Sequence, residues 1–403
     1  MSRCGTLLAV LTSAVLLVGC DAHPPERAEA PRGAALAGDF SGSGPGTLVA
    51  AESLPDLDPD LRAAASLAAR ITYVSTSGIN DSHPQVSGTV FVPPGDPPPG
   101  GWRIVAFGHP ATGIQPECAP SASPTLLGSA PDVTALLQAG YVVTMSDYQG
   151  LGLAGAYHPF LDSTSEGYDL IDSVRATRKL VPKTSENWVA YGVGQGGQAA
   201  WAANELTTDY RGGLNLVGVA AVAPTAALDW LADGAADGTL TADQQLTLQQ
   251  FVAALAKEYD DFDPDAYRHG VVKDNWDTFS ACWGPAFQAR AELTKALGPD
   301  DLRPDSPDAT QVLRGYLQKT SLPQAPTAAP MLVVLDGPDG LIPQAATETA
   351  LARACAMGDV VSSIARHEDG DETAGLVEWI GDRFDGVPAH NDCPSAPASG
   401  APS

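Results

Sequence analysis

Residues 188–200 read WVAYGVGQGGQAA. Its first four residues predict a buried strand, its run of glycines predicts a tight turn, and the small residues after Gly197 predict a helix. A strand that passes through a sharp glycine turn into a helix is the setting of a nucleophile elbow, with the pattern G-x-S-x-G. The outer glycines are Gly192 and Gly196, but Gly194 occupies the serine position, and no other G-x-S-x-G occurs in the chain.

Gly194 offers no side chain that could attack a carbonyl carbon or carry an acyl group. An elbow holds its nucleophile in a disfavoured backbone conformation that stores about 1 to 3 kcal/mol of strain, and glycine relieves much of that strain. The stretch therefore predicts an elbow that keeps its shape and has lost its covalent chemistry.

Short β-branched runs alternate with helical patterns on both sides of the elbow, which is typical of a mostly parallel sheet covered by helices on both faces. The expected strands are residues 71–76, 85–92, 103–107, 141–146, 188–191, 216–222, 331–335 and 360–366. The expected helices are residues 132–138, 168–180, 197–206, 345–357 and 374–384. These patterns place the chain in the α/β fold class.

One long stretch interrupts the alternation. The residues between the strands at 216–222 and 331–335 have no strand signal, but they have helical patterns that include 241–256 and 309–319. We expect residues 226–325 to form a helical cap insertion and residues 48–225 and 326–393 to form the core. Because ligands of open α/β sheets bind beyond the carboxyl ends of the strands, such an insertion is expected to cover a ligand site.

The N-terminus carries an apolar stretch, Leu7–Val18, that is too short to span a bilayer and is soon followed by Cys20. This arrangement is typical of a bacterial lipoprotein signal, and the alternative is an ordinary signal peptide with an incidental cysteine. We expect a signal peptide at residues 1–19, lipidation of Cys20, a flexible tether at 20–47 and a flexible tail at 394–403. The interpretation predicts an exported lipoprotein that is anchored to the bacterial cell membrane and faces outward.

Charge and cysteine content narrow the function classes further. A formal net charge of -26 disfavours binding to nucleic acid or to an anionic membrane surface, because both depend on clustered lysine and arginine. After processing, four cysteines would remain: Cys118, Cys282, Cys355 and Cys393. An oxidising compartment favours two disulfides among them, and the sequence leaves three pairings open. No spacing typical of a zinc site occurs, so no metal or cofactor is expected.

Several segments, in this order and at this spacing, resemble the secretory lipase family, which includes type A lipases of yeasts and many actinobacterial lipases. They span roughly residues 65–393: 108–113 (GHPATG), 118–121 (CAPS), 147–152 (DYQGLG), 157–160 (YHPF), 172–176 (DSVRA), 192–197 (GVGQGG) and 379–384 (WIGDRF). The resemblance implies an α/β-hydrolase fold and a triacylglycerol lipase or carboxylesterase activity. It also implies oxyanion donors at Gly113 and Gln195, and the disulfides Cys118–Cys282 and Cys355–Cys393.

The resemblance further implies an acid and a base. Asp339 matches the aspartate of the family's D-x-x-VP segment, and the alternative is a turn aspartate that caps a helix. Distance along the chain places the base at His367, whereas the local pattern places Glu372 where a histidine belongs. The oxyanion loop also departs from the family, because Pro110 replaces a glycine and removes one backbone donor.

These departures favour a catalytically inactive α/β-hydrolase that binds a lipid, acyl, ester or peptide-like ligand at the cell surface. Two other hypotheses stay open: an active lipase or esterase with a non-standard site, and a structural envelope protein. His109 and His158 are expected to be structural residues that pack the loops around them.

Overall fold

The computed structural model describes residues 33–337, 340–366 and 373–394. The expected signal peptide, Cys20, Asp339, His367 and Glu372 lie outside the described residues, as does all of the expected tail except residue 394.

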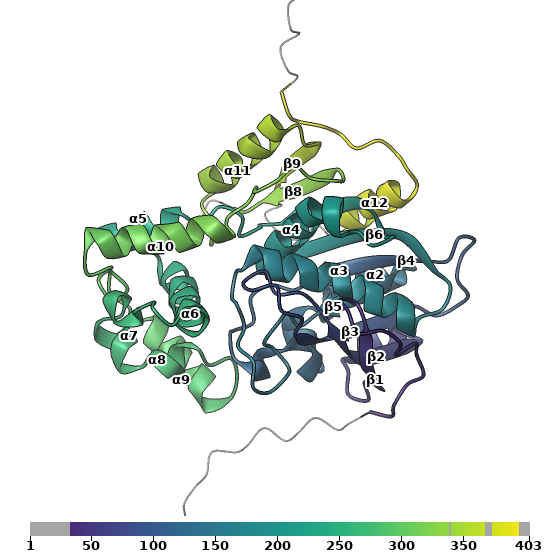
Figure 1. Ribbon diagram of the computed structural model, residues 1–403, viewed down its shortest axis with the longest axis horizontal. Coiled ribbons are helices and arrows are strands. Elements are labelled where there is room, and N and C mark those ends of the chain that lie inside the picture. Colours follow the sequence, from purple (N-terminus) through teal and green to yellow (C-terminus); the bar gives the residue numbers. More distant parts are fainter. Residues whose placement is uncertain (1–32, 338–339, 367–372, 395–403) are drawn as a thin grey trace, which may run out of the picture. The chain divides into compact units, whose positions relative to one another are not determined.

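Within the described residues, nine strands form one sheet: β1 (Leu48–Ser53), β2 (Leu67–Val74), β3 (Gln85–Val92), β4 (Trp102–Gly108), β5 (Val142–Ser146), β6 (Thr184–Val193), β7 (Asn215–Val222), β8 (Met331–Leu335) and β9 (Val361–Ala365). Their order is β1-β2-β3-β5-β4-β6-β7-β8-β9 (Figure 1). The pairs among β1, β2, β3 and β5 are antiparallel, and the pairs from β5 through β4 to β9 are parallel. The prediction of a mostly parallel sheet is confirmed.

Helices cover both faces of this sheet, and each face has its own apolar core. One core includes residues of α3 (Ser163–Leu180), α4 (Gln195–Tyr210) and α11 (Gln344–Met357). The other includes residues of α1 (Pro59–Ala64), α2 (Ala130–Gln138) and α12 (Thr373–Phe384). Three short 3₁₀ helices follow β4: η1 (Pro116–Cys118), η2 (Pro120–Ala122) and η3 (Leu126–Gly128).

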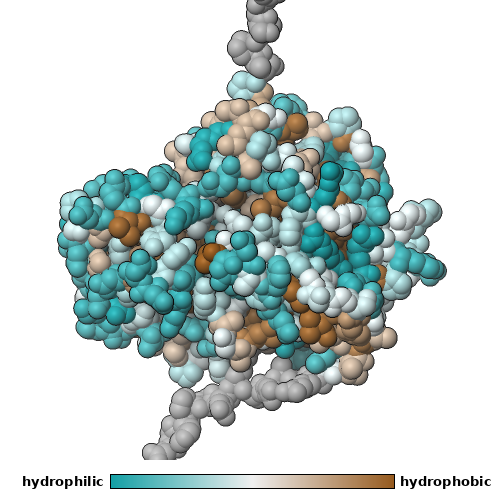
Figure 2. Space-filling view, in the orientation of Figure 1, coloured by the Kyte–Doolittle hydropathy of each residue, from teal (hydrophilic) through white to brown (hydrophobic). Residues whose placement is uncertain are grey.

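The expected insertion between β7 and β8 is helical throughout its regular structure. It contains α5 (Trp230–Asp237), α6 (Ala242–Glu258), η4 (Pro264–Tyr267), α7 (Gly270–Asp274), α8 (Trp276–Phe279), α9 (Gly284–Thr294) and α10 (Pro307–Thr320). These helices share an apolar core, which also takes in Phe160 and Leu161 from the loop before α3. On the face shown in Figure 2, the outer surface of this cap is mostly hydrophilic.

The flexible tether expected at residues 20–47 is wrong for its described part. Residues 33–47 run along the sheet edge, where the Leu36 N–H donates to the Ala51 carbonyl at 2.9 Å and the Asp39 N–H donates to the Lys179 carbonyl at 2.9 Å. Strand β1, which the sequence did not indicate, lies between this segment and β2. The alanine-rich composition resembles a linker, but backbone hydrogen bonds with β1 and with helix α3 hold the segment in place.

Element boundaries differ from the expected ones mainly where polar residues begin an element. Strands β3 and β8 have the expected bounds, whereas β6 begins at Thr184, ahead of its apolar residues. Helix α3 begins at Ser163 because the Asp162 side chain caps it, accepting a hydrogen bond from the Ser165 N–H at 2.8 Å.

Candidate active site

The predicted elbow lies at the junction of β6 and α4. Gly194 has φ 57° and ψ -116°, outside the regions that L-residues favour, and it precedes the first residue of α4. Its N–H donates to the Val222 carbonyl at 2.9 Å, and its own carbonyl accepts from the Gln198 N–H at 3.1 Å and the Thr225 N–H at 3.2 Å. These bonds fix the turn to β7 and to the helix, so the elbow geometry is present without a nucleophile.

Close backbone packing explains the outer glycines of the elbow. A Cβ atom on Gly192 would lie 2.0 Å from the Gly196 carbonyl oxygen, and one on Gly196 would lie 1.9 Å from the Gly108 carbonyl oxygen. In contrast, the nearest atom to a Cβ on Gly194 would be Cβ of Pro110, at 3.9 Å. Space for a side chain therefore exists at Gly194, and only its backbone conformation favours glycine there.

The oxyanion loop follows β4 and is tied to the cap. Gly113 has φ +132°, and a Cβ on it would lie 2.6 Å from the Cys118 sulfur, so it packs on the disulfide. Cys118 is bonded to Cys282 with an S–S distance of 2.05 Å, as the family resemblance implied. Pro110 has no N–H to donate, and it is this residue that faces the side-chain position of Gly194.

The N–H of Gln195, one of the two expected oxyanion donors, lies at the start of α4. Gln195 is the first residue of this helix, and the first N–H groups of an α-helix have no acceptor within the helix. The Gln195 N–H can therefore donate to a carbonyl oxygen or an anion placed at the elbow, where the helix dipole also favours negative charge.

The side chain of Gln195 joins a buried polar network behind the elbow. Its Nε2 donates to Oε1 of Glu166 at 2.6 Å and to Nε2 of His158 at 2.9 Å. The Nδ1–H of His158 donates to the Gln149 carbonyl at 2.9 Å, which leaves Nε2 as the acceptor. Burial lowers the pKa of His158 to about 3, so its ring is neutral at neutral pH.

Glu166 is the member of this network that the sequence did not reveal. It is fully buried, its Oε1 also accepts from the Leu161 N–H at 3.0 Å, and burial raises the pKa of its carboxyl well above the usual range. In the sequence, Glu166 lies ahead of the helix expected at residues 168–180, and no pattern marks it as a buried residue. Its burial depends on the packing of α3 against α4, which has no local signal.

His109 lies within the oxyanion loop and is fully buried. Its ring packs on the Tyr148 ring with centroids 4.4 Å apart, and its Nδ1 is 2.7 Å from the Pro110 carbonyl oxygen. Burial lowers the pKa of His109 as well. These contacts agree with the structural role expected for this residue.

Asp147 explains why two of the segments that resemble the family lie together. Its carboxylate accepts from the Ser121 N–H at 2.9 Å and from the Ser87 hydroxyl at 2.6 Å. These bonds hold the segment at 118–121 against the segment at 147–152, and so they fix the base of the oxyanion loop.

The expected acid Asp339 and the two expected base positions, His367 and Glu372, lie outside the described residues, so the structure gives no acid or base for the elbow from these positions. Strands β8 and β9, which precede these residues, are parallel to β6, so their carboxyl ends lie on the same edge of the sheet as Gly194. Oδ1 of Asp336, in the segment that follows β8, lies 3.5 Å from Nη1 of Arg366.

A cavity of about 1010 Å³ lies between the cap and the loops of the core. Its lining is Ile114, Gln115, Pro116, Glu117, Gly155, Ala156, Tyr157, His158, Ala253, Ala254, Ala256, Lys257, Pro264, Arg268, Trp276, Asp277, Ser280, Ala281 and Ala286. His158 belongs both to this lining and to the network behind the elbow. Throughout the described ranges, no group of three or more His, Cys, Asp and Glu side chains is placed to hold a metal ion.

The sheet order, the elbow and the cap define an α/β-hydrolase fold. The chain belongs to the secretory lipase family, whose model matches residues 129–392. A comparison with curated protein sequences gives no match.

Solved structures with the same fold have low sequence identity to this chain. Candida antarctica lipase A in its closed state is 17% identical with a TM-score of 0.70, covering 92% of this chain and 90% of its own. The esterase LipA from Xanthomonas oryzae, which degrades rice cell wall, is 22% identical with a TM-score of 0.67, covering 86% and 97%. A protein from Legionella pneumophila is 17% identical with a TM-score of 0.67, covering 85% of this chain and 100% of its own.

No helix among the described residues is both long enough and apolar enough to cross a membrane.

Proposed function

We propose that this chain is a non-hydrolytic secretory lipase family member that binds a lipid, acyl or ester-like ligand under its cap. One observation carries the proposal: Gly194 stands in the elbow with φ 57° and ψ -116°, and the space for a nucleophile side chain is open. A backbone without a hydroxyl or thiol at this position cannot form an acyl-enzyme. The retained Gln195 N–H supports binding of a carbonyl or carboxylate group at the same place.

The cavity under the cap supports the choice of ligand. Its volume of about 1010 Å³ is at the upper end of the usual range for small-molecule sites. Alanine, proline and isoleucine side chains form much of its wall, and charged side chains such as Lys257 and Arg268 are also present. An acyl chain with a polar head matches this mixture, because apolar walls bind the chain and the polar groups orient the head.

We further propose that the protein is exported and anchored outside the cell membrane through lipidated Cys20. The apolar stretch before Cys20 and the secretory character of the family support export. Acyl chains on Cys20 would insert into the membrane and hold the protein at its surface.

Fluorophosphonate labelling of the purified protein tests the loss of hydrolysis directly, with p-nitrophenyl butyrate turnover as the second measurement. We expect no covalent adduct and a rate close to the buffer blank, because the reagent needs an activated side-chain nucleophile. A slow residual rate from the oxyanion donors would be insensitive to the phosphonate. Stoichiometric labelling of any residue would refute the non-hydrolytic assignment.

Binding of a fluorescent fatty acid tests the ligand class, and two alanines of α9 provide a matched pair of variants. Ala286 lines the cavity and Ala291 does not, although both are exposed. We expect Ala286→Trp to weaken fatty acid binding at least about tenfold by occupying the cavity, and Ala291→Trp to leave it unchanged. Equal binding by both variants would place the ligand elsewhere, and no saturable binding by the wild type would refute the ligand class.

A further inference from the structure

A second cavity lies at the β9 end of the sheet, away from the elbow strand β6. Its volume is about 560 Å³. It is lined by residues of β8 and β9, by one side of α12 and by the C-terminal segment at 388–392: Leu332, Ser362, Ser363, Ile364, Gly375, Leu376, Trp379, Asp382, Arg383, Pro388, His390 and Asp392. Among the described residues, the elbow glycine Gly194 and the expected oxyanion donors Gly113 and Gln195 do not line this cavity.

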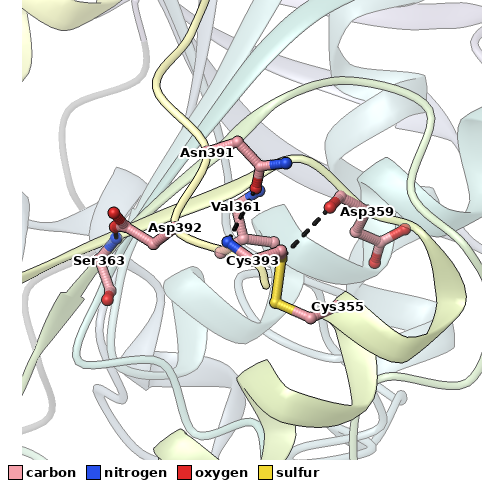
Figure 3. The surroundings of a disulfide bond; sticks show 7 residues. All are labelled: Cys355, Asp359, Val361, Ser363, Asn391, Asp392 and Cys393. Carbon is pink, nitrogen blue, oxygen red and sulfur yellow. Dashed lines mark hydrogen bonds between the residues drawn. A yellow bond between two sulfur atoms is a disulfide. The ribbon is translucent and has the colours of Figure 1, made fainter. Parts of the chain in front are cut away.

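The wall formed by residues 388–392 is held in place covalently and by hydrogen bonds, as Figure 3 shows. Cys393 is bonded to Cys355 of α11, and the Val361 N–H donates to Oδ1 of Asn391 at 3.2 Å. The Asp392 carboxylate accepts from the Ser363 N–H at 2.8 Å through Oδ2 and lies 2.8 Å from Nε2 of His390 through Oδ1. Each oxygen of Asp392 therefore already has one polar partner.

Arg383, on the α12 wall of the cavity, has a buried guanidinium group. Its residue is only 5% exposed, and its Nε and Nη1 have no hydrogen-bond partner among the described residues. Nη2 lies 3.9 Å from Oδ2 of Asp382, too far for a hydrogen bond, and that carboxylate is half exposed. The guanidinium carbon lies 4.8 Å from the centroid of the Trp379 ring.

A buried guanidinium stays charged at neutral pH, and its N–H groups lose their hydration without replacement when no acceptor is present. The ring of Trp379 offsets part of this loss through a cation–π interaction, but it provides no acceptor in the plane of the N–H groups. Nε and Nη1 are shielded from solvent in this conformation. An anion in the adjoining cavity would supply acceptors to the guanidinium once the side chain turns toward it.

We propose that this cavity is a binding site for a small monocarboxylate that carries an apolar or aromatic group. The planar fork of Arg383 matches the two oxygens of a carboxylate. The indole of Trp379 and the side chains of Leu332, Leu376 and Ile364 provide the apolar surface for the rest of the ligand. Asp382 on the same wall repels a dianion more strongly than a monoanion, which favours a carboxylate over a phosphate.

Isothermal titration of the full-length protein with benzoate tests this site, with benzyl alcohol and inorganic phosphate as comparison probes. We expect saturable benzoate binding with a Kd below about 1 mM, and at least tenfold weaker binding of both comparison probes. Arg383→Met should weaken benzoate binding at least about tenfold, because it removes the fork and keeps a long apolar side chain. Arg103→Met is the matched control, since Arg103 lies over the Phe384 ring of α12 but does not line the cavity.

A second pair of variants keeps the test decisive if Arg383→Met does not fold. Ile364 lines the cavity but is 43% exposed, so it tolerates polar substitution. Ile364→Glu should weaken benzoate binding about tenfold by repulsion and by competing for Arg383, whereas Ile364→Gln should change it less than about threefold. Equal benzoate affinity in the two variants, or saturable binding that is unchanged in Arg383→Met, would overturn the proposal. Absence of saturable benzoate binding by the wild type would also overturn it.

Discussion

Replacing Gly194 with serine rebuilds the G-x-S-x-G pattern and tests both the strain and the chemistry of the elbow. A serine Cβ would have no neighbour closer than 3.9 Å, so the substitution creates no overlap. The remaining cost is conformational, because φ 57° with ψ -116° is a region that non-glycine residues rarely adopt. We expect the free energy of unfolding of Gly194→Ser to fall by about 1 to 3 kcal/mol.

Urea denaturation, monitored by circular dichroism, measures this loss of stability. An m-value equal to that of the wild type would indicate that the variant unfolds between the same native and unfolded states. Gly192→Ser is the control, because its Cβ would overlap the Gly196 carbonyl oxygen at 2.0 Å whatever its backbone conformation. It should lose more than about 3 kcal/mol or fail to fold. A loss at Gly194→Ser below about 0.5 kcal/mol would show that the elbow is not strained, and a loss as large as that of Gly192→Ser would show that the position is crowded.

The same variant tests the chemistry. We expect Gly194→Ser to hydrolyse p-nitrophenyl butyrate no faster than about tenfold above the wild type, because a serine hydroxyl needs a positioned base. The family pattern places Glu372 where that base belongs, so the double variant Gly194→Ser/Glu372→His is the companion test. Rapid hydrolysis by Gly194→Ser that collapses on adding His367→Ala would identify His367 as a surviving base. That result would refute the expectation that the base is lost together with the nucleophile.

Three further predictions concern the stability and location of the chain. Replacing both Cys118 and Cys282 by alanine should lower the free energy of unfolding by about 2 to 4 kcal/mol, because their disulfide closes a long loop between core and cap. An unchanged midpoint in urea denaturation would refute this prediction. Cys20→Ala should move the protein from the membrane fraction to the soluble exported fraction on immunoblots, and unchanged membrane retention would exclude the anchor. Burial raises the pKa of Asp169 to about 8. The folded state therefore holds a proton that the unfolded state releases, and the stability should fall as pH rises from about 4 to 8, by up to about 1.4 kcal/mol per pH unit. Asp169→Asn removes the titrating carboxyl but retains an oxygen acceptor for the Gln149 N–H. Denaturation midpoints of this variant, measured across pH, should decline less steeply than those of the wild type. An equally steep decline would contradict the assignment to Asp169.

Local patterns in the sequence were sufficient for much of the fold and for the centre of the site. The period-two run of β3 and the apolar run of β8 have the bounds expected from sequence, and the turn around Gly194 follows from its glycines alone. These features depend on side-chain periodicity and on backbone freedom, which are properties of a few consecutive residues. The family resemblance added the two disulfide pairings, which spacing alone left open among three.

Tertiary structure decided what depends on partners far away in the chain. Residues 33–47 and β1 are ordered by hydrogen bonds to neighbouring strands, and composition does not encode such bonds.

The burial of polar side chains also depends on residues far away in the chain. Glu166 and Arg383 have the sequence signature of surface residues, yet both are buried, one against Gln195 and the other beside an open cavity. The glycine at position 194 can be read from the sequence alone, because a glycine offers no side-chain nucleophile wherever it lies in the fold. Only the tertiary structure decided which charges are buried and what they face, because burial is a property of packed surfaces and not of any single segment.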